Sequence, residues 1–283
     1  MKIDIHNNLI EFGSIYLENH IVLSIKGDSP KVEEFLQGQV TSDISMLSDN
    51  SSQLSCICNH KGIVLADFII IKKDMEFKFI LDGEAGFEKI LINELMPFAK
   101  FSNVEFIKTN EKVIGKISPQ SNSKEAYLSN EFFEISINIA NKPNKLENSI
   151  SISQWNAANK ILGNLFLRFD DMGKYRPLEI NYDNLRVSFE KGCYRGQEIV
   201  ARMKYLGVDR RKFCTLITEE NFFNQFEPRA FPQPDDEDIW KRKLLKNVGE
   251  IINIKGKCIF NSIVKKDDLP KLTEILPGII QIF

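Results

Sequence analysis

A short segment, residues 191–198, carries the residue types most able to do chemistry in this chain of 283 residues. It reads Lys-Gly-Cys-Tyr-Arg-Gly-Gln-Glu, so the thiol of Cys193 has a cation two residues to either side, Lys191 and Arg195. A positive charge beside a thiol favours the thiolate, which is the nucleophilic form. We therefore predict that Cys193 is a functional thiol and that Lys191 and Arg195 keep it partly ionised. This stretch is called the Cys193 segment below.

The element that follows the Cys193 segment is predicted to be a helix. From Arg195 onward, Ile199, Val200 and Met203 fall on one face and charged side chains fall on the other. The thiol would then lie where a loop enters a helix, beside unpaired backbone N–H groups and the positive end of the helix dipole, a place that favours anions. The alternative is a cysteine that fills space in the core, which the polar residues around it disfavour.

Positive charge is concentrated in residues 186–212, although the net charge of the chain is −2. This basic stretch holds eight Lys or Arg residues and three Asp or Glu residues. It fits either a solvated basic face or a site for an anionic ligand, such as a polyglutamate tail, a phosphate or RNA. Few aromatic residues, Tyr194 and Tyr205 among them, lie between the cations, which disfavours direct RNA binding.

Further motifs connect the Cys193 segment to a known family. They are the segment 27–43 with Phe-Leu-Gln-Gly-Gln and Thr-Ser-Asp, the turn Cys-Asn-His-Lys-Gly at 58–62, the stretch 186–202, and the pair Gly249-Glu250. Together they resemble the YgfZ family, folate-binding proteins related to the aminomethyltransferase (T-protein) of the glycine cleavage system. The resemblance covers nearly the whole chain.

The resemblance implies an α+β fold of three domains, arranged as a ring around a central folate cavity, with a C-terminal β-barrel. The implied first domain is discontinuous and comprises residues 1–21 plus 109–182. The second comprises residues 22–108 plus 183–206 and carries the Cys193 segment. The third, residues 207–283, is the barrel.

The resemblance also implies a set of folate-binding residues. In the related enzymes a glutamate accepts two parallel hydrogen bonds from the pterin ring, and Glu179 is the candidate here, with a surface glutamate after a proline turn as the alternative. Arg202 would attract the glutamate of folate, while Gln197 and Glu198 would fix the loop through hydrogen bonds. Asp67 completes the set.

The hairpin that carries Asp67 departs from the T-protein pattern. The T-protein has two consecutive acids there, whereas this chain has Ala66-Asp67. Alanine cannot transfer a proton, so aminomethyltransferase activity is not expected, and whether the chain is an enzyme stays open. A folate-dependent one-carbon transferase is the alternative function, with Asp67 or Asp43 as its acid or base.

The function implied by the resemblance is therefore that of a tetrahydrofolate-binding accessory protein. It would support the assembly or repair of iron–sulfur enzymes, including those that modify tRNA. Its expected partners are folate, as tetrahydrofolate or a derivative, and those enzymes. Direct tRNA binding through the basic stretch is a third hypothesis.

Composition limits the remaining possibilities. The five cysteines include no Cys-x-x-Cys pair, which indicates a reducing cytoplasm and no disulfide framework. Cys56 and Cys58 alone are too few for a metal site, and no metal is expected. No apolar run approaches the ~18 residues that span a bilayer, and the first residues lack the apolar region of a secretory signal.

Hydrophobic periodicity predicts the elements around these motifs. A helix begins at Ser29 as the cap, with Pro30 first in the helix, and buries Val32, Phe35 and Leu36. Strands at 53–58 and 63–72 form a hairpin about residues 59–62. A helix over 84–96 is ended by Pro97, and Ser153 caps a helix that runs to Ile161. Residues 213–218, 248–254 and 257–263 are strands, and 228–238 is a proline-rich acidic loop.

Overall fold

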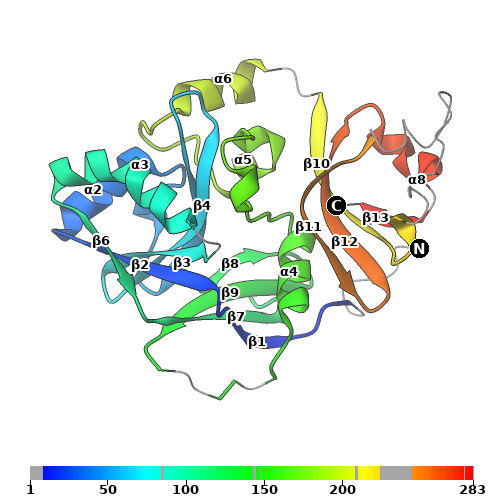
Figure 1. The fold of residues 1–283 in the computed structure, drawn as a ribbon, viewed down its shortest axis with the longest axis horizontal. Helices are drawn as coiled ribbons and strands as arrows, with labels where there is room; N and C mark the ends of the chain where they lie inside the picture. The colour runs from blue at the N-terminus through cyan, green and yellow to red at the C-terminus, as the bar shows by residue number, and fades with distance from the viewer. Residues whose placement is uncertain are drawn as a thin grey trace.

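Three antiparallel sheets form the framework of the protein (Figure 1). The computed structural model describes residues 9–83, 86–142, 145–146, 148–207, 210–223, 244–276 and 278–282. The first sheet has the order β1 (Gly13–Tyr16), β7 (Lys112–Pro119), β9 (Phe133–Ala140), β8 (Ala126–Ser129). The second has the order β3 (Ser51–Cys58), β4 (Val64–Lys73), β5 (Glu76–Asp82), β2 (His20–Lys26), β6 (Glu105–Thr109). The third has the order β11 (Lys246–Ile254), β12 (Lys257–Lys265), β10 (Arg211–Glu219), β13 (Ile279–Ile282).

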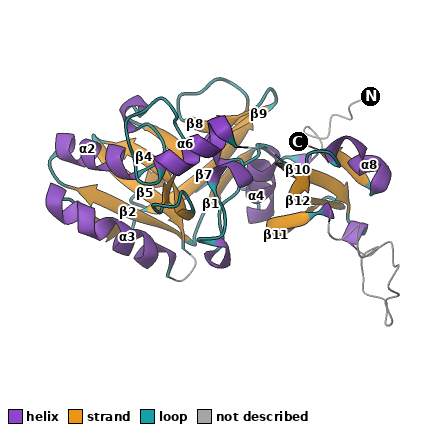
Figure 2. Ribbon diagram, turned by 90° about the horizontal axis from the view of Figure 1, so that it is seen from above, coloured by secondary structure: helices purple, strands orange, loops and turns teal. Residues whose placement is uncertain are grey.

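Helices cover these sheets and join them (Figure 2). The helices are α2 (Ser29–Gln39), α3 (Phe87–Ser102), α4 (Ile152–Ile161), α5 (Tyr182–Leu185), α6 (Gln197–Leu206) and α8 (Leu272–Ile275). Short 3-10 turns lie at Ile44–Met46, Phe169–Asp171, Pro177–Glu179 and Leu269–Lys271. In Figure 1, α4 and α5 lie in the middle of the molecule, between the three sheets.

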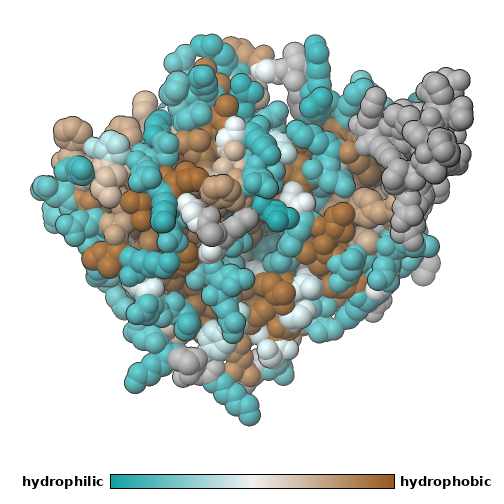
Figure 3. Space-filling view, in the orientation of Figure 1, coloured by the Kyte–Doolittle hydropathy of each residue, from teal (hydrophilic) through white to brown (hydrophobic). Residues whose placement is uncertain are grey.

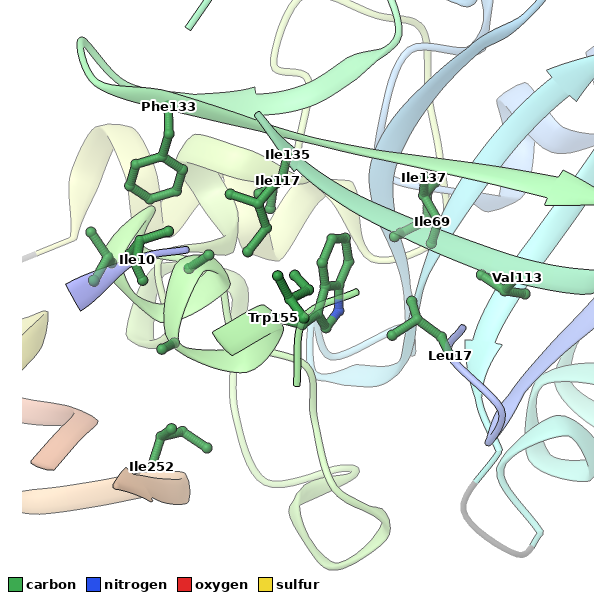
Figure 4. Packing of buried hydrophobic residues seen from close by; sticks show 14 of the residues in the cluster. Ile10, Leu17, Ile69, Val113, Ile117, Phe133, Ile135, Ile137, Trp155 and Ile252 are labelled. Atoms are coloured by element: carbon green, nitrogen blue, oxygen red, sulfur yellow. The ribbon is translucent and has the colours of Figure 1, made fainter. Parts of the chain in front are cut away.

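The second sheet is buried on both faces because its strands carry apolar residues at successive positions. Phe68, Ile70 and Phe79 pack with α2 and α3 in one core cluster. Ile69 and Ile80, one residue away along the same strands, pack in another cluster with the first sheet and α4. Figure 4 shows Trp155 of that second cluster among residues of both sheets.

Trp155 also explains a glycine in the first sheet. A Cβ built on Gly115 of β7 would lie 2.7 Å from a ring carbon of Trp155, closer than carbon atoms approach. The indole is 1% exposed, so it has no room to move. Gly115 therefore allows α4, the helix that carries Trp155, to pack directly on the first sheet.

Most predicted elements are present, but three helix boundaries were wrong. Pro97 does not end its helix: α3 runs through it to Ser102, because its buried face of Leu91, Leu95 and Ala99 continues past the proline. Asp28, not Ser29, is the N-cap of α2. In α4 the cap is Ser151, whose hydroxyl accepts from the backbone N–H of Gln154.

Among the described residues the third sheet is open, so the predicted C-terminal β-barrel is not confirmed. Within the described ranges its strands have two outer members, β11 and β13, that do not pair with each other. The predicted acidic loop 228–238 lies outside the described residues. Strands of the predicted domains fall in separate sheets, but the domain boundaries themselves stay predictions. No helix in the described part of the chain has both the length and the apolarity to cross a bilayer.

Candidate functional site: the Cys193 segment and the central cavity

The Cys193 segment lies, as the pattern predicts, in an irregular loop that enters a helix. Cys193 is exposed, and α6 begins four residues later at Gln197. Gly196 is the N-cap of that helix and has a φ of 86°, in the left-handed region that glycine adopts without a steric cost. The thiol is therefore open to solvent at the start of a ten-residue helix.

Two glycines fix the Cys193 segment onto the hairpin turn at 59–62. A Cβ on Gly196 would lie 2.3 Å from the carbonyl oxygen of Asn59, and a Cβ on Gly62 would lie 3.2 Å from Ile199. The Asn59 side chain shapes this turn by accepting from the backbone N–H groups of Lys61 and Ile63. The Cys193 segment, with the helix that follows it, and the 59–62 turn therefore pack directly against each other.

Lys191 points into the protein. Its ammonium donates to the carbonyl oxygens of Val40 (2.7 Å) and Ser42 (3.0 Å), just after α2, and lies 5.3 Å from the ring centre of Tyr194. Burial lowers the pKa of Lys191 to about 8, although Asp43 opposes the shift. Its cation ties the Cys193 segment to the loop after α2.

The Arg195 guanidinium also contacts groups other than the Cys193 thiol. Its Nε donates to the carbonyl oxygen of Cys58 (2.8 Å), its Nη1 pairs with Glu94 of α3 (3.0 Å), and its guanidinium lies 5.7 Å from the ring centre of Phe98. The bonds that the structure gives to both predicted cations thus lead to other groups, and partial ionisation of Cys193 stays a prediction.

Asp67 is part of a buried ion pair. Its carboxylate lies 3.3 Å from the Arg186 guanidinium, accepts from the Tyr182 hydroxyl at 2.9 Å and from the backbone N–H of Leu167, and has a side chain only 1% exposed. Burial raises the pKa of Asp67, while Arg186 and Tyr182 act against that rise. A carboxylate enclosed in this way has no open side toward a ligand.

Sequence reasoning gave no role to Arg186, although it holds the centre of the molecule together. Its Nη1 donates to the carbonyl oxygens of Ser55 and Phe68 in the second sheet, and its Nη2 donates to Asn164 Oδ1 and the carbonyl oxygen of Leu165. The side chain is 0% exposed. An isolated Arg in a polar stretch gives no signal of burial, because arginine is rarely buried unless paired.

The remaining predicted site residues have local structural contacts. Glu179 accepts from the backbone N–H of Arg176 at 2.8 Å and closes a one-turn capping box. Arg202 and Glu198 form an exposed i, i+4 pair on α6 at 2.8 Å. Gln197 is the first residue of α6 and is half-buried. Their folate-binding roles stay predictions.

The basic stretch 186–212 does not form one free cationic surface. Arg186 and Lys191 are buried, and Arg195, Arg202 and Lys204 each pair with a carboxylate. Figure 3 shows hydrophilic residues spread over much of this face, interspersed with hydrophobic ones. The pairing reduces the charge available to an RNA backbone.

A central cavity of about 810 Å³ lies among the described residues. Its wall comes from the loop between β1 and β2, the end of β5, helix α4, the segment 164–168 and β11. Amide side chains line it at Asn19, Asn156, Asn159 and Asn164, and ionisable side chains line it at Glu18, His20, Asp82, Lys160, Arg168 and Glu250.

Two groups of this wall have spare hydrogen-bonding capacity. Nδ1 of His20 is buried with no hydrogen-bond partner among the described residues, and burial lowers the pKa of His20 against the opposing charge of Asp82. Lys160 is 5% exposed, and among the described residues its ammonium makes a single hydrogen bond, to Asn261 Oδ1 at 2.8 Å. Buried polar groups are normally satisfied, so this wall is suited to a polar ligand.

None of the predicted site residues is among the described residues that line the cavity. The cavity wall contacts the buried Asp67–Arg186 ion pair from behind. Leu167, which lines the cavity, donates to Asp67, and Asn164 and Leu165, which also line it, accept from Arg186. Asn164, Lys160 and their neighbours carry no recognisable motif, because they come from separate elements. In the described residues no group of three or more His, Cys, Asp or Glu is placed to hold a metal ion.

The fold is that of the T-protein class. The glycine cleavage system aminomethyltransferase T from Bartonella henselae superposes with a TM-score of 0.51 at 15% identity, over 92% of this chain and 87% of that one. No family model matches the sequence.

Curated relatives define the family within that class. The chain is 28% identical to the tRNA-modifying protein YgfZ of Klebsiella pneumoniae over 235 residues, 71% of this chain and 70% of the relative. It is also 28% identical to the protein of the same name from Colwellia psychrerythraea, over 93% of this chain and 86% of the relative. The chain belongs to the YgfZ family, as the motifs predicted.

Proposed function

We propose that the protein binds tetrahydrofolate or a derivative in the central cavity, with three domains arranged as a ring around it. The observation that carries this proposal is a cavity of about 810 Å³ whose wall combines carboxylates, amides and a cation. A reduced pterin presents adjacent N–H donors, which a carboxylate accepts in parallel, and Glu18, Asp82 and Glu250 are the carboxylates that line the cavity. The unpartnered His20 Nδ1 also suits a polar ligand.

This proposal shifts the ligand away from the residues that the motifs indicated. Glu179 is committed to a capping box and Asp67 to an ion pair, whereas the cavity carboxylates line open volume. The Cys193 segment would then act at the outer surface, where its exposed thiol can meet another protein.

Calorimetry with tetrahydrofolate tests the binding site. Asn156 is half-buried on α4 and lines the cavity, so Asn156→Trp should fill part of the volume and weaken binding at least tenfold. Ser153→Trp is the matched control, because Ser153 is a half-buried residue of the same helix outside the cavity lining. Absence of heat with the wild-type protein at millimolar ligand would contradict folate binding, and equal weakening by both variants would contradict its location.

We further propose that the protein supports iron–sulfur enzymes, including those that modify tRNA, in the cytoplasm. The support is family membership and the name of its relatives, tRNA-modifying protein. A deletion strain complemented with wild type or Cys193→Ala, scored for methylthiolated tRNA, tests this role. Cys193→Ala should restore little of the modification. Full restoration would contradict the hypothesis that the Cys193 thiol is functional.

The alternative, one-carbon transfer, is disfavoured by the surroundings of Asp67. That carboxylate is 1% exposed and faces Arg186 and Tyr182, so it cannot reach a ligand in the cavity. Incubation with tetrahydrofolate and a methylamine donor should give no methylene-tetrahydrofolate, and turnover at an enzymatic rate would restore the alternative.

A further inference from the structure

Lys160 is held by a closed ring of hydrogen bonds between α4 and the third sheet. Its ammonium donates to Asn261 Oδ1 (2.8 Å), the Asn261 amide donates to Thr215 Oγ1 (2.9 Å), and the Thr215 hydroxyl donates to the carbonyl oxygen of Lys160 (2.6 Å). The ring fixes the lysine at both its backbone and its tip. A side chain held in this way has lost its conformational freedom before any ligand arrives.

The electrostatic surroundings of Lys160 favour the neutral amine. Burial lowers its pKa to about 8, and only Glu250 opposes that shift. The other ionisable groups of the cavity wall are Tyr16, Glu18, His20, Asp82 and Arg168. At pH 8 about half of Lys160 is therefore unprotonated, compared with under ~1% of an ordinary exposed lysine.

Two other buried lysines lack the same combination. Lys191 also has a pKa of about 8, but its ammonium donates to two backbone carbonyls and it does not line the cavity. Lys78 is paired with Glu111 at 2.7 Å and does not line the central cavity. Lys160 unites burial, a single neutral acceptor and a place in the wall of a large cavity.

We propose that Lys160 is a carbonyl-reactive amine that forms an imine with a small aldehyde in the central cavity. The lone pair of the amine forms the C–N bond as the carbonyl π bond breaks, and one proton passes from the nitrogen to the carbonyl oxygen to give a carbinolamine. Loss of the hydroxyl as water, with the proton of the nitrogen, gives the imine, and addition of water reverses both steps. Lysines with depressed pKa values serve this chemistry in proteins.

Glu250 is placed to assist these proton transfers. It lines the same cavity, its charge acts on Lys160, and its carboxylate is held by the Asn156 amide at 2.7 Å. Carbinolamine formation and dehydration both need a group that gives and takes a proton. This inference goes beyond the proposed folate binding, since it assigns a covalent site to the cavity wall.

Reductive alkylation of the folded protein tests the inference. Wild-type protein is treated with limiting acetaldehyde and sodium cyanoborohydride at pH 6.5 to 10, with ~0.5 pH spacing around the midpoint, and the modified lysines are identified by peptide mass mapping. Lys160 should be alkylated at least tenfold faster at pH 8 than the exposed lysines, with a rate midpoint near its pKa of about 8. The rates of the exposed lysines should keep rising to higher pH.

Lys191 is the internal control. Faster alkylation of Lys160 than of Lys191 attributes the reactivity to the cavity, whereas equal rates would attribute it to the pKa alone and overturn the proposal. Lys160 alkylated no faster than the exposed lysines would also overturn it. Lys160→Arg, which keeps the charge, should abolish the fast phase. If that variant fails to fold, the wild-type rates decide.

Discussion

The Cys193 segment and the central cavity each contain a buried lysine, yet they use it differently. In the segment, Lys191 donates to two backbone carbonyls and Arg195 binds a carbonyl and a carboxylate. In the cavity wall, Lys160 donates to one acceptor among the described residues and lies beside open volume. Lys191 uses two of its three N–H donors on the backbone, whereas Lys160 uses one on a side chain among the described residues and so keeps more hydrogen-bonding capacity for a ligand.

The largest effect is expected from Arg186, which joins the second sheet to the cavity wall. Arg186→Met should cost about 3–5 kcal/mol of unfolding free energy, because it leaves the Asp67 carboxylate buried without its charge partner. Urea denaturation measures the loss. The double variant Arg186→Met, Asp67→Asn should recover part of it, and a single variant within about 1 kcal/mol of wild type would contradict the central role of this residue.

A smaller effect should separate the two glycines of the Cys193 segment. Gly196→Ala should destabilise the protein by about 2–4 kcal/mol, since its Cβ would meet the Asn59 carbonyl oxygen and its φ is positive. Gly192→Ala is the matched control, because a Cβ there has no atom within 4 Å. It should change the unfolding free energy by less than about 0.5 kcal/mol. Equal effects would mean that the contact with the hairpin does not hold the segment.

The pH dependence of stability compares the two buried lysines directly. Their folded-state pKa values of about 8 lie below the ordinary value of 10.5, so the unfolded chain binds the proton more tightly. Stability should therefore rise with pH from about 7, where both are charged, toward 10.5. Between pH 7 and 9, wild type should gain about 1 kcal/mol relative to Lys160→Met, and similarly relative to Lys191→Met. Denaturant titrations at each pH test this, and a flat difference would contradict the burial argument.

The smallest effect is expected at the exposed thiol. Cys193→Ala should change the unfolding free energy by less than about 0.5 kcal/mol, whereas Cys58→Ala, at a fully buried position, should cost about 1 kcal/mol through lost packing. Thermal unfolding of both variants gives the comparison. A large loss at Cys193 would show that its side chain is structural, and would undermine the tRNA-modification test.

Local patterns in the sequence predicted the elements well. The hairpin about 59–62, the buried face of Val32, Phe35 and Leu36, and the helix after the Cys193 segment follow from periodicity and turn residues, and the structure confirms them. The course of α3 through Pro97 could not be predicted locally, because packing on both sides of the proline decides it.

The candidate site was predicted only in part. Cys193 could be identified because its neighbours form a contiguous motif. The cavity could not, since Glu18, Lys160 and Glu250 are distant in sequence and converge only through the fold. The sequence also could not predict that Lys191 points inward or that Arg186 is buried. A charged side chain is expected at the surface unless its acceptors are known.

The chain crosses between the first and second sheets twice, through the short links from β1 to β2 and from β6 to β7. Two covalent tethers between the same pair of bodies remove most of their freedom to rotate apart. The third sheet follows α6 through one connection and meets α4 through hydrogen bonds such as the Lys160 ring. Entry of a large ligand into the central cavity should therefore depend on how far the third sheet moves. The first and second sheets would stay fixed relative to each other.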